Sequence, residues 1–161
     1  MAAKATGIGS VAPGFSLQDS AGTYHSLDSF HGKYVLVDFW KYGCIPCIEQ
    51  FPKLRELYAG YKAKGFEILG VFHCVFEGDK KNRQEWVKIV QKENPTWTGL
   101  IDYEDTVCQA YGVEAFPSNF LLSPDGKVIT YNIEPHQLSL WLEKTLGEPV
   151  KRQIVHCPDT P

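Results

Sequence analysis

Two cysteines three residues apart, Cys44 and Cys47, stand between an apolar segment and an amphipathic one. The apolar segment, Tyr34–Trp40, is rich in β-branched residues and predicts a strand buried on both faces. Over residues 45–64 the apolar side chains recur at steps of three and four, which predicts a helix, with a kink at Pro52. The cysteine pair therefore opens a helix directly after a buried strand.

Strands and helices alternate along the rest of the chain. Further strands are expected over Phe15–Leu17, Thr23–His25, Phe66–Phe76, Trp97–Ile101, Ser118–Ser123 and Lys127–Ile133, and further helices over Gly78–Glu93, Tyr103–Ala110 and Pro135–Leu146. The last two strands are joined by a tight turn, so we expect them to be antiparallel. This order predicts an α/β fold in which helices cover both faces of a mixed sheet.

Composition limits the class of protein. A chain of 161 residues with 43% hydrophobic residues is long enough for one packed domain, which excludes wholesale disorder. The net charge of -3 gives no reason to expect a nucleic-acid partner. The longest apolar runs are far shorter than the roughly 18 residues of a membrane span, so no span is expected in this chain.

The position of the cysteine pair suits redox chemistry. Unpaired N–H groups and the dipole at a helix start stabilise a thiolate, so we expect Cys44 to be the nucleophile. Cys47 lies one turn further along the same face and is expected to resolve a mixed disulfide on Cys44. Pro46 suits a first helical turn, and we place it among the substrate-binding residues. A zinc site would need a second pair of ligands at similar spacing, so neither metal nor cofactor is expected.

The run Val35–Trp40 with Cys44-Ile45-Pro46-Cys47 resembles the thioredoxin-fold oxidoreductases. The resemblance implies a thioredoxin-like three-layer α/β/α sandwich with an extra N-terminal hairpin, covering residues 9–147. Residues 1–8 are then expected to be a leader or a remnant of one, and residues 148–161 a C-terminal extension.

The segment Ala115-Phe116-Pro117-Ser118 resembles the cis-proline loop that faces the cysteine pair in this fold. The resemblance implies that Pro117 is cis and that the backbone of Phe116 is free to pair with a substrate peptide. The alternative is an ordinary trans proline at the start of a strand.

The segments Gly9–Leu17 and Phe120–Val128 resemble the peroxiredoxin and TlpA/ResA-like branch of the AhpC/TSA-related superfamily. Lys41 stands where peroxiredoxins have threonine, so the TlpA/ResA-like thiol–disulfide oxidoreductases fit better. The chain departs from their pattern at Gly43, where they usually have tryptophan, and at Asp38, where they commonly have asparagine and thioredoxin itself has an acid.

Two acids are candidates for accepting the proton that leaves Cys47. Asp38 lies inside an apolar strand, so burial would raise its pKa and suit it to general base catalysis, unless its head reaches solvent at the strand end. Glu77 follows a predicted strand where related reductases resemble this chain in carrying an active-site Glu; it could equally be an acid stabilised by a helix start.

The other candidate residues surround the pair or lie apart from it. Trp40 and Tyr42 are expected to line the groove beside Cys44, although core packing explains Trp40 almost as well. We expect Cys74 and Cys108 to be buried, inert thiols, and Cys157 to lie in a polar, proline-rich tail.

The resemblance implies a protein-disulfide reductase whose partners are a disulfide-bearing protein and a thiol electron donor. A thiol peroxidase and a binding module without turnover are the alternatives. TlpA/ResA-like members are typically exported or membrane-tethered in bacteria, which implies a periplasmic or other extracytoplasmic location for a chain lacking its export signal, the cytoplasm being the alternative. The oligomeric state does not follow from the sequence, and a monomer is the expectation.

Overall fold

The computed structural model describes residues 6–74 and 79–151. Its centre is a seven-stranded sheet in the order β2-β1-β5-β4-β3-β6-β7. The strands are β1 (Ser16–Gln18), β2 (Tyr24–Ser26), β3 (Tyr34–Lys41), β4 (Phe66–His73), β5 (Thr98–Asp102), β6 (Ser118–Leu122) and β7 (Val128–Tyr131). β3, β4 and β5 are parallel, and the outer strands are antiparallel to their neighbours. The predicted mixed sheet, with an N-terminal hairpin and an antiparallel final pair, is confirmed.

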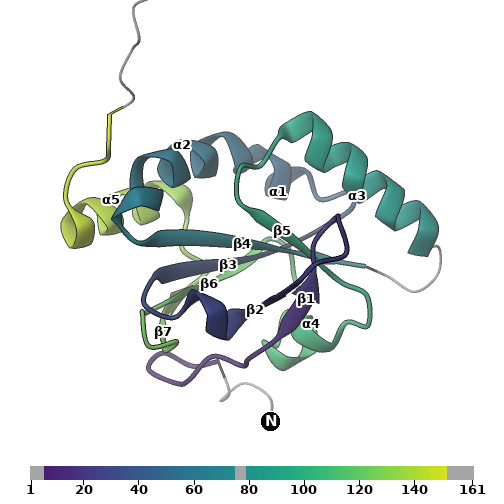
Figure 1. Cartoon of the computed structure of the whole chain (residues 1–161), viewed down its shortest axis with the longest axis horizontal. Coiled ribbons are helices and arrows are strands. Elements are labelled where there is room, and N and C mark those ends of the chain that lie inside the picture. Colours follow the sequence, from purple (N-terminus) through teal and green to yellow (C-terminus); the bar gives the residue numbers. More distant parts are fainter. Residues whose placement is uncertain (1–5, 75–78, 152–161) are drawn as a thin grey trace, which may run out of the picture.

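Helices cover both faces of the sheet. They are α1 (Ile45–Glu49), α2 (Phe51–Tyr61), α3 (Asp79–Glu93), α4 (Thr106–Ala110) and α5 (Pro135–Leu146), with short 3-10 turns at η2 (Leu27–Phe30) and η3 (Lys62–Lys64). α1, α2, α3 and α5 lie on one face and α4 on the other (Figure 1). Among the described residues, no helix combines the length and the apolar character needed to cross a bilayer.

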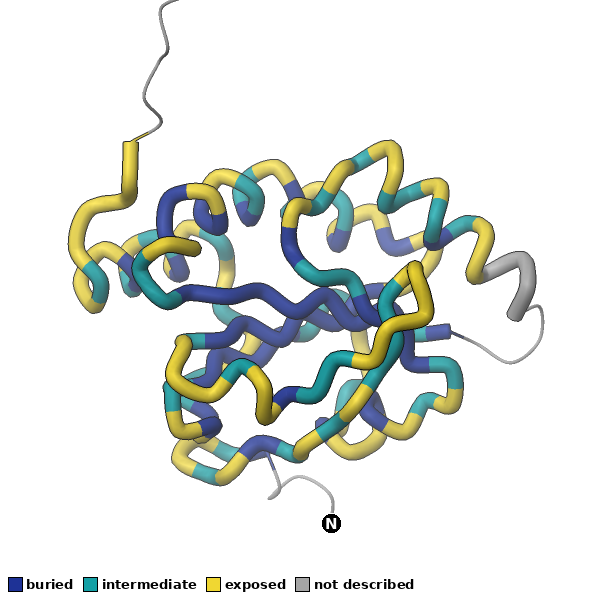
Figure 2. Tube along the Cα trace, in the orientation of Figure 1, coloured by how far each residue is buried: buried dark blue, intermediate teal, exposed yellow. Residues whose placement is uncertain are grey.

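Strand β3 divides its side chains between two hydrophobic cores. Leu36 and Trp40 belong to the core under α1, α2 and α5, whereas Val35, Val37 and Phe39 belong to the core on the α4 side. Successive strand residues point to opposite faces, so a strand that packs against both layers needs apolar residues at nearly every position. The trace through β3 and β4 is accordingly buried over most of its length (Figure 2).

The predicted helix over residues 45–64 is divided. α1 ends at Glu49 and α2 begins at Phe51, with Pro52 in its first turn. A proline there lacks an N–H that the helix start would leave unpaired in any case, so the chain starts a new helix at this point. Gly65 ends the helical region in the left-handed conformation, with φ 91°.

Two other predicted boundaries are wrong. β4 ends at His73 rather than at Phe76, because its neighbours end there too: His73 pairs with Lys41, the last residue of β3, and with Asp102, the last of β5. α4 begins at Thr106 rather than at Tyr103, because Asp105 precedes it with a positive φ of 58° and breaks any continuous helix.

Candidate active site

The structure joins Cys44 and Cys47 in a disulfide, with an S–S distance of 2.08 Å. Cys44 is the N-cap residue of α1, and its Sγ accepts a hydrogen bond from the backbone N–H of Cys47 at 3.3 Å. Cys44 is 7% exposed and Cys47 1% exposed. The sulfur at the helix start is therefore both stabilised by a helix N–H and the more accessible of the two to a partner.

The turn that delivers Cys44 depends on Gly43. Gly43 has a φ of 79°, a left-handed conformation that side chains with a Cβ rarely adopt. The backbone N–H of Cys44 donates to the carbonyl of Lys41 at 3.3 Å, which closes the turn after β3. A Cβ on Gly43 would have nothing within 4 Å, so the glycine serves the backbone conformation and leaves the surface beside Cys44 open.

Aromatic side chains pack in the same hydrophobic core as the redox pair. The ring of Phe51 lies edge-on to Trp40 and to Trp97, with centroids 5.2 and 5.3 Å apart, and Trp40 packs on Phe72 at 4.9 Å. Trp40 is 2% exposed, so it belongs to the core and does not line a surface groove. Tyr42, in contrast, is 49% exposed.

Asp38 is buried beneath the same face of the sheet. It shares the orientation of Leu36 and Trp40 along β3, and the core that contains those residues also contains Cys44 and Cys47. Asp38 is 2% exposed, and its Oδ1 has no hydrogen-bond partner among the described residues. Burial raises the pKa of this carboxyl to about 7. The alternative in which its head reaches solvent is therefore wrong.

The peptide bond between Phe116 and Pro117 is cis, as the resemblance implied, and the trans alternative is wrong. Pro117 directly precedes β6, whose first residue, Ser118, pairs with Phe39 of β3. The cis-proline loop is thereby held beside the strand that leads to Cys44. The Nζ of Lys41, the last residue of β3, lies 5.3 Å from the centroid of the Phe116 ring, so the end of this strand contacts the cis-proline loop.

Residues 8–131 match the model of the AhpC/TSA family. The chain belongs to the AhpC/TSA family. It is 39% identical to thiol-disulfide oxidoreductase ResA of Geobacillus thermodenitrificans over 124 residues, which cover 77% of this chain and 68% of the relative. ResA of Bacillus thuringiensis subsp. konkukian is 36% identical over 139 residues, covering 86% of this chain and 76% of the relative.

The chain is also similar to solved structures of thiol-disulfide oxidoreductases. The thioredoxin domain of a thiol-disulfide oxidoreductase from Bacteroides vulgatus matches with a TM-score of 0.77 and 34% identity, over 87% of this chain and 98% of that one. A thiol:disulfide interchange protein from Bacteroides sp. matches with a TM-score of 0.77 and 32% identity, over 97% of each chain. This AhpC/TSA-family chain is therefore a thioredoxin-fold thiol–disulfide oxidoreductase of the TlpA/ResA-like branch with a C-x-x-C redox pair.

The remaining candidates of this AhpC/TSA-family chain fall into three groups. Pro46 is exposed in the first turn of α1, next to the redox pair. Glu77 and Cys157 lie outside the described residues. Cys74 and Cys108 are buried, as expected.

Sequence reasoning missed His73, which stacks on Phe116 with ring centroids 5.2 Å apart. The sequence carries no signal for this role, because His73 lies inside the strand predicted over Phe66–Phe76 and only the pairing of β4 with its neighbours shows that the strand ends there. Asp102 ends the next strand in register with His73, and Lys41 ends the strand on the other side.

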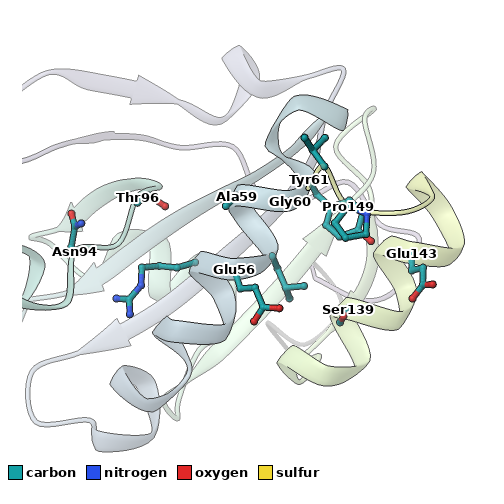
Figure 3. A pocket seen from close by; sticks show the side chains of 12 residues that line it. Glu56, Ala59, Gly60, Tyr61, Asn94, Thr96, Ser139, Glu143 and Pro149 are labelled. Carbon is teal, nitrogen blue, oxygen red and sulfur yellow. The ribbon is translucent and has the colours of Figure 1, made fainter. Parts of the chain in front are cut away.

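A cavity of about 680 Å³ lies away from the redox pair, between α2 and α5 (Figure 3). Gly60 on α2, Glu143 on α5 and Pro149 of the segment after α5 are among the residues that line it. The backbone N–H of Val150 donates to the carbonyl of Gly60 at 2.9 Å, and the Tyr61 hydroxyl donates to the carbonyl of Gly147 at 3.0 Å. These bonds fasten the segment after α5 onto α2.

Proposed function

We propose that this oxidoreductase reduces disulfides in partner proteins, with Cys44 as the nucleophile and Cys47 as the resolving thiol. The observation that carries the proposal is the asymmetry of the pair. Cys44 caps a helix and is the more exposed sulfur, whereas Cys47 is almost completely buried behind it. Only Cys44 can meet an incoming disulfide directly.

The reaction has two exchange steps. In the reduced protein the Cys44 thiolate attacks one sulfur of the partner disulfide, and the partner's other sulfur leaves as a thiolate. Cys47 then loses its proton and attacks the Cys44 sulfur, which releases the second partner thiolate and forms the Cys44–Cys47 disulfide. A dithiol donor returns the pair to the reduced state, and neither metal nor further cofactor takes part.

Asp38 is proposed to accept the proton from Cys47. The carboxyl lies on the face of β3 that packs under the redox pair, and burial holds its pKa near neutrality. A base of this pKa can be ionised before the exchange and protonated after it, which is the condition for efficient general base catalysis near pH 7. Glu77, the other candidate, remains a proposal from the sequence.

The partner's backbone is proposed to lie along the cis-proline loop. Phe116 is half-buried between His73 and Lys41, so its backbone is held in place by its own ring. Tyr42 and Pro46 are exposed two residues before and after Cys44 in the sequence, and we include them in the proposed contact surface. Backbone pairing of this kind accepts many sequences, since it recognises the extended chain rather than particular side chains.

The test is a trapping experiment with reduced protein and insulin as the disulfide substrate. Cys47→Ser should accumulate a mixed disulfide through Cys44, whereas the matched Cys44→Ser variant should form none, and the unaltered chain should turn over. Equal trapping by both variants would show that the assigned roles are wrong. Rapid consumption of hydrogen peroxide without insulin reduction would favour a thiol peroxidase, and substrate binding that is unaffected by Cys44→Ser would favour a binding module.

We also propose that the protein acts outside the cytoplasm of a bacterium. The support is its similarity to TlpA/ResA-like reductases, which act on disulfides and therefore suit a compartment where disulfides persist. Fractionation of the source cell, followed by detection of this chain, tests the location. Recovery in the cytoplasmic fraction alone would contradict it.

A further inference from the structure

Three side chains that can bind a metal ion lie close together on the face of the sheet opposite the redox pair. They belong to His73, Asp105 and Cys108. One nitrogen or oxygen or sulfur from each residue lies within 4.8 Å of the other two. His73 comes from the end of β4, Asp105 precedes α4, and Cys108 lies within α4. The sequence offers no hint of this grouping, because the residues come from two separate segments and share no zinc-type spacing.

The contact between His73 and Asp105 lacks the alignment of a hydrogen bond. Nδ1 of His73 is buried and lies 2.9 Å from Oδ1 of Asp105, yet it has no hydrogen-bond partner among the described residues. The two atoms are therefore close together without the geometry of a hydrogen bond. A cation bound by both atoms would satisfy them at once.

A second acidic residue, Asp102, lies beside this group of side chains. Asp102 is 1% exposed, and its Oδ2 accepts hydrogen bonds from the backbone N–H groups of Val107 and Cys108 at 3.1 and 3.0 Å. Its Oδ1 is buried without a hydrogen-bond partner among the described residues. Across the described part of the chain, no lysine or arginine forms an ion pair with Asp102 or Asp105. Within the described residues, these two carboxylates beside a thiol therefore have His73, but no lysine or arginine, as a cationic neighbour.

We propose that His73, Asp105 and Cys108 form a binding site for a divalent transition-metal ion of the zinc class. Imidazole, carboxylate and thiolate are all zinc ligands, and a set of three leaves one coordination position for water or another ligand. Tetrahedral coordination requires ligand atoms about 3.3–3.6 Å apart. The present atoms lie within 4.8 Å of one another, so metal binding requires the three side chains to rotate toward a common centre. Binding releases the Cys108 proton to solvent, because the thiolate is the ligand.

The proposed metal site is accessible from solvent and contacts the cis-proline loop through His73. The side chains of His73 and Asp105 are 18% and 29% exposed, so an ion can reach them from solvent, while Cys108 is buried beneath. The His73 ring stacks on Phe116, which precedes Pro117. A metal ion on His73 would therefore fix the residue on which the proposed substrate contact rests, although the metal site itself does not depend on the proposed function.

The test uses the full chain with Cys44→Ser, Cys47→Ser and Cys157→Ser, so that only Cys74 and Cys108 remain as thiols. Titration with Co²⁺ should give one equivalent of binding with a thiolate-to-cobalt charge-transfer band, and Zn²⁺ should displace the cobalt. His73→Gln and Asp105→Asn should each weaken binding about tenfold or more. Cys108→Ala should abolish the charge-transfer band, whereas the matched Cys74→Ala should keep it.

The partly exposed positions keep the experiment decisive if Cys108→Ala fails to fold. Unchanged Co²⁺ affinity in both His73→Gln and Asp105→Asn, with circular dichroism showing folded protein, would overturn the proposal. So would a charge-transfer band that survives Cys108→Ala or disappears with Cys74→Ala. An independent readout is the oxidised, otherwise unaltered chain, whose Tm should rise with added Zn²⁺ and should not rise in Asp105→Asn.

Discussion

Replacing Asp38 with asparagine should make the protein's stability less dependent on pH. In the folded chain burial raises the pKa of Asp38 from 3.8 to about 7. Below pH 3.8 the carboxyl is protonated in both the folded and the unfolded state, so it contributes no pH dependence there. Above that pH the unfolded chain releases a proton that the folded chain retains, and stability falls until the folded carboxyl also ionises near pH 7.

The size of the effect follows from the shift. A change of about 3 pKa units corresponds to about 4 kcal/mol of unfolding free energy. Because asparagine does not titrate, Asp38→Asn should gain stability relative to the unaltered chain as pH rises. The gain should be close to zero near pH 4, should reach about 4 kcal/mol near pH 7 and should stay constant above it.

The assay is guanidinium unfolding of both oxidised proteins at several values between about pH 4 and pH 8. Asp28→Asn is the matched control for replacing an aspartate by asparagine, because its carboxylate is 81% exposed instead of buried. The substitution can also change the free energy of unfolding by a constant amount at every pH, because the amide packs differently from the carboxyl; the test therefore rests on how the difference varies with pH. A difference between Asp38→Asn and the unaltered chain that does not change with pH would show that burial does not hold the proton on Asp38, and would refute the reasoning.

Three further substitutions test packing and hydrogen bonds in different parts of the fold. Gly60→Ala would place a Cβ 2.7 Å from that of Pro149, so thermal unfolding should show a loss of about 1–3 kcal/mol that Pro149→Gly relieves. Phe51→Ala removes a fully buried ring and should cost about 3–5 kcal/mol in denaturant unfolding. Asn119→Ala leaves the N–H and C=O of Ile133 without their side-chain partners and should cost about 1–3 kcal/mol, with faster amide exchange at Ile133.

Local patterns were sufficient to predict much of the fold and the redox pair. The apolar run of β3 reflects burial on both faces, and the cysteine spacing reflects one helical turn after it. Helix α5 has the predicted bounds, Pro135–Leu146, because its proline start and Gly147 end are both encoded within a few residues. The cis bond before Pro117 followed from a resemblance, which carries information that composition and periodicity do not.

Features that depend on distant pairing were beyond the sequence. The end of β4 at His73 is set by the ends of two neighbouring strands, so no pattern within β4 itself marks it. Trp40 was expected beside the substrate groove, but its contacts with Phe51 and Phe72 place it in the core. The grouping of His73 with Cys108 likewise requires knowing that α4 folds back over the ends of the parallel strands.

The alternation of side chains along β3 separates two kinds of chemistry in this protein. Asp38 points toward the core that contains the redox pair, while its neighbours Val37 and Phe39 point toward the core that contains Cys108. A shift of one residue in the pairing of β3 would exchange these faces and bury the carboxyl on the wrong side. Phe116 packs against both cores. Substitutions in either core could therefore shift Phe116 and alter the proposed substrate contact.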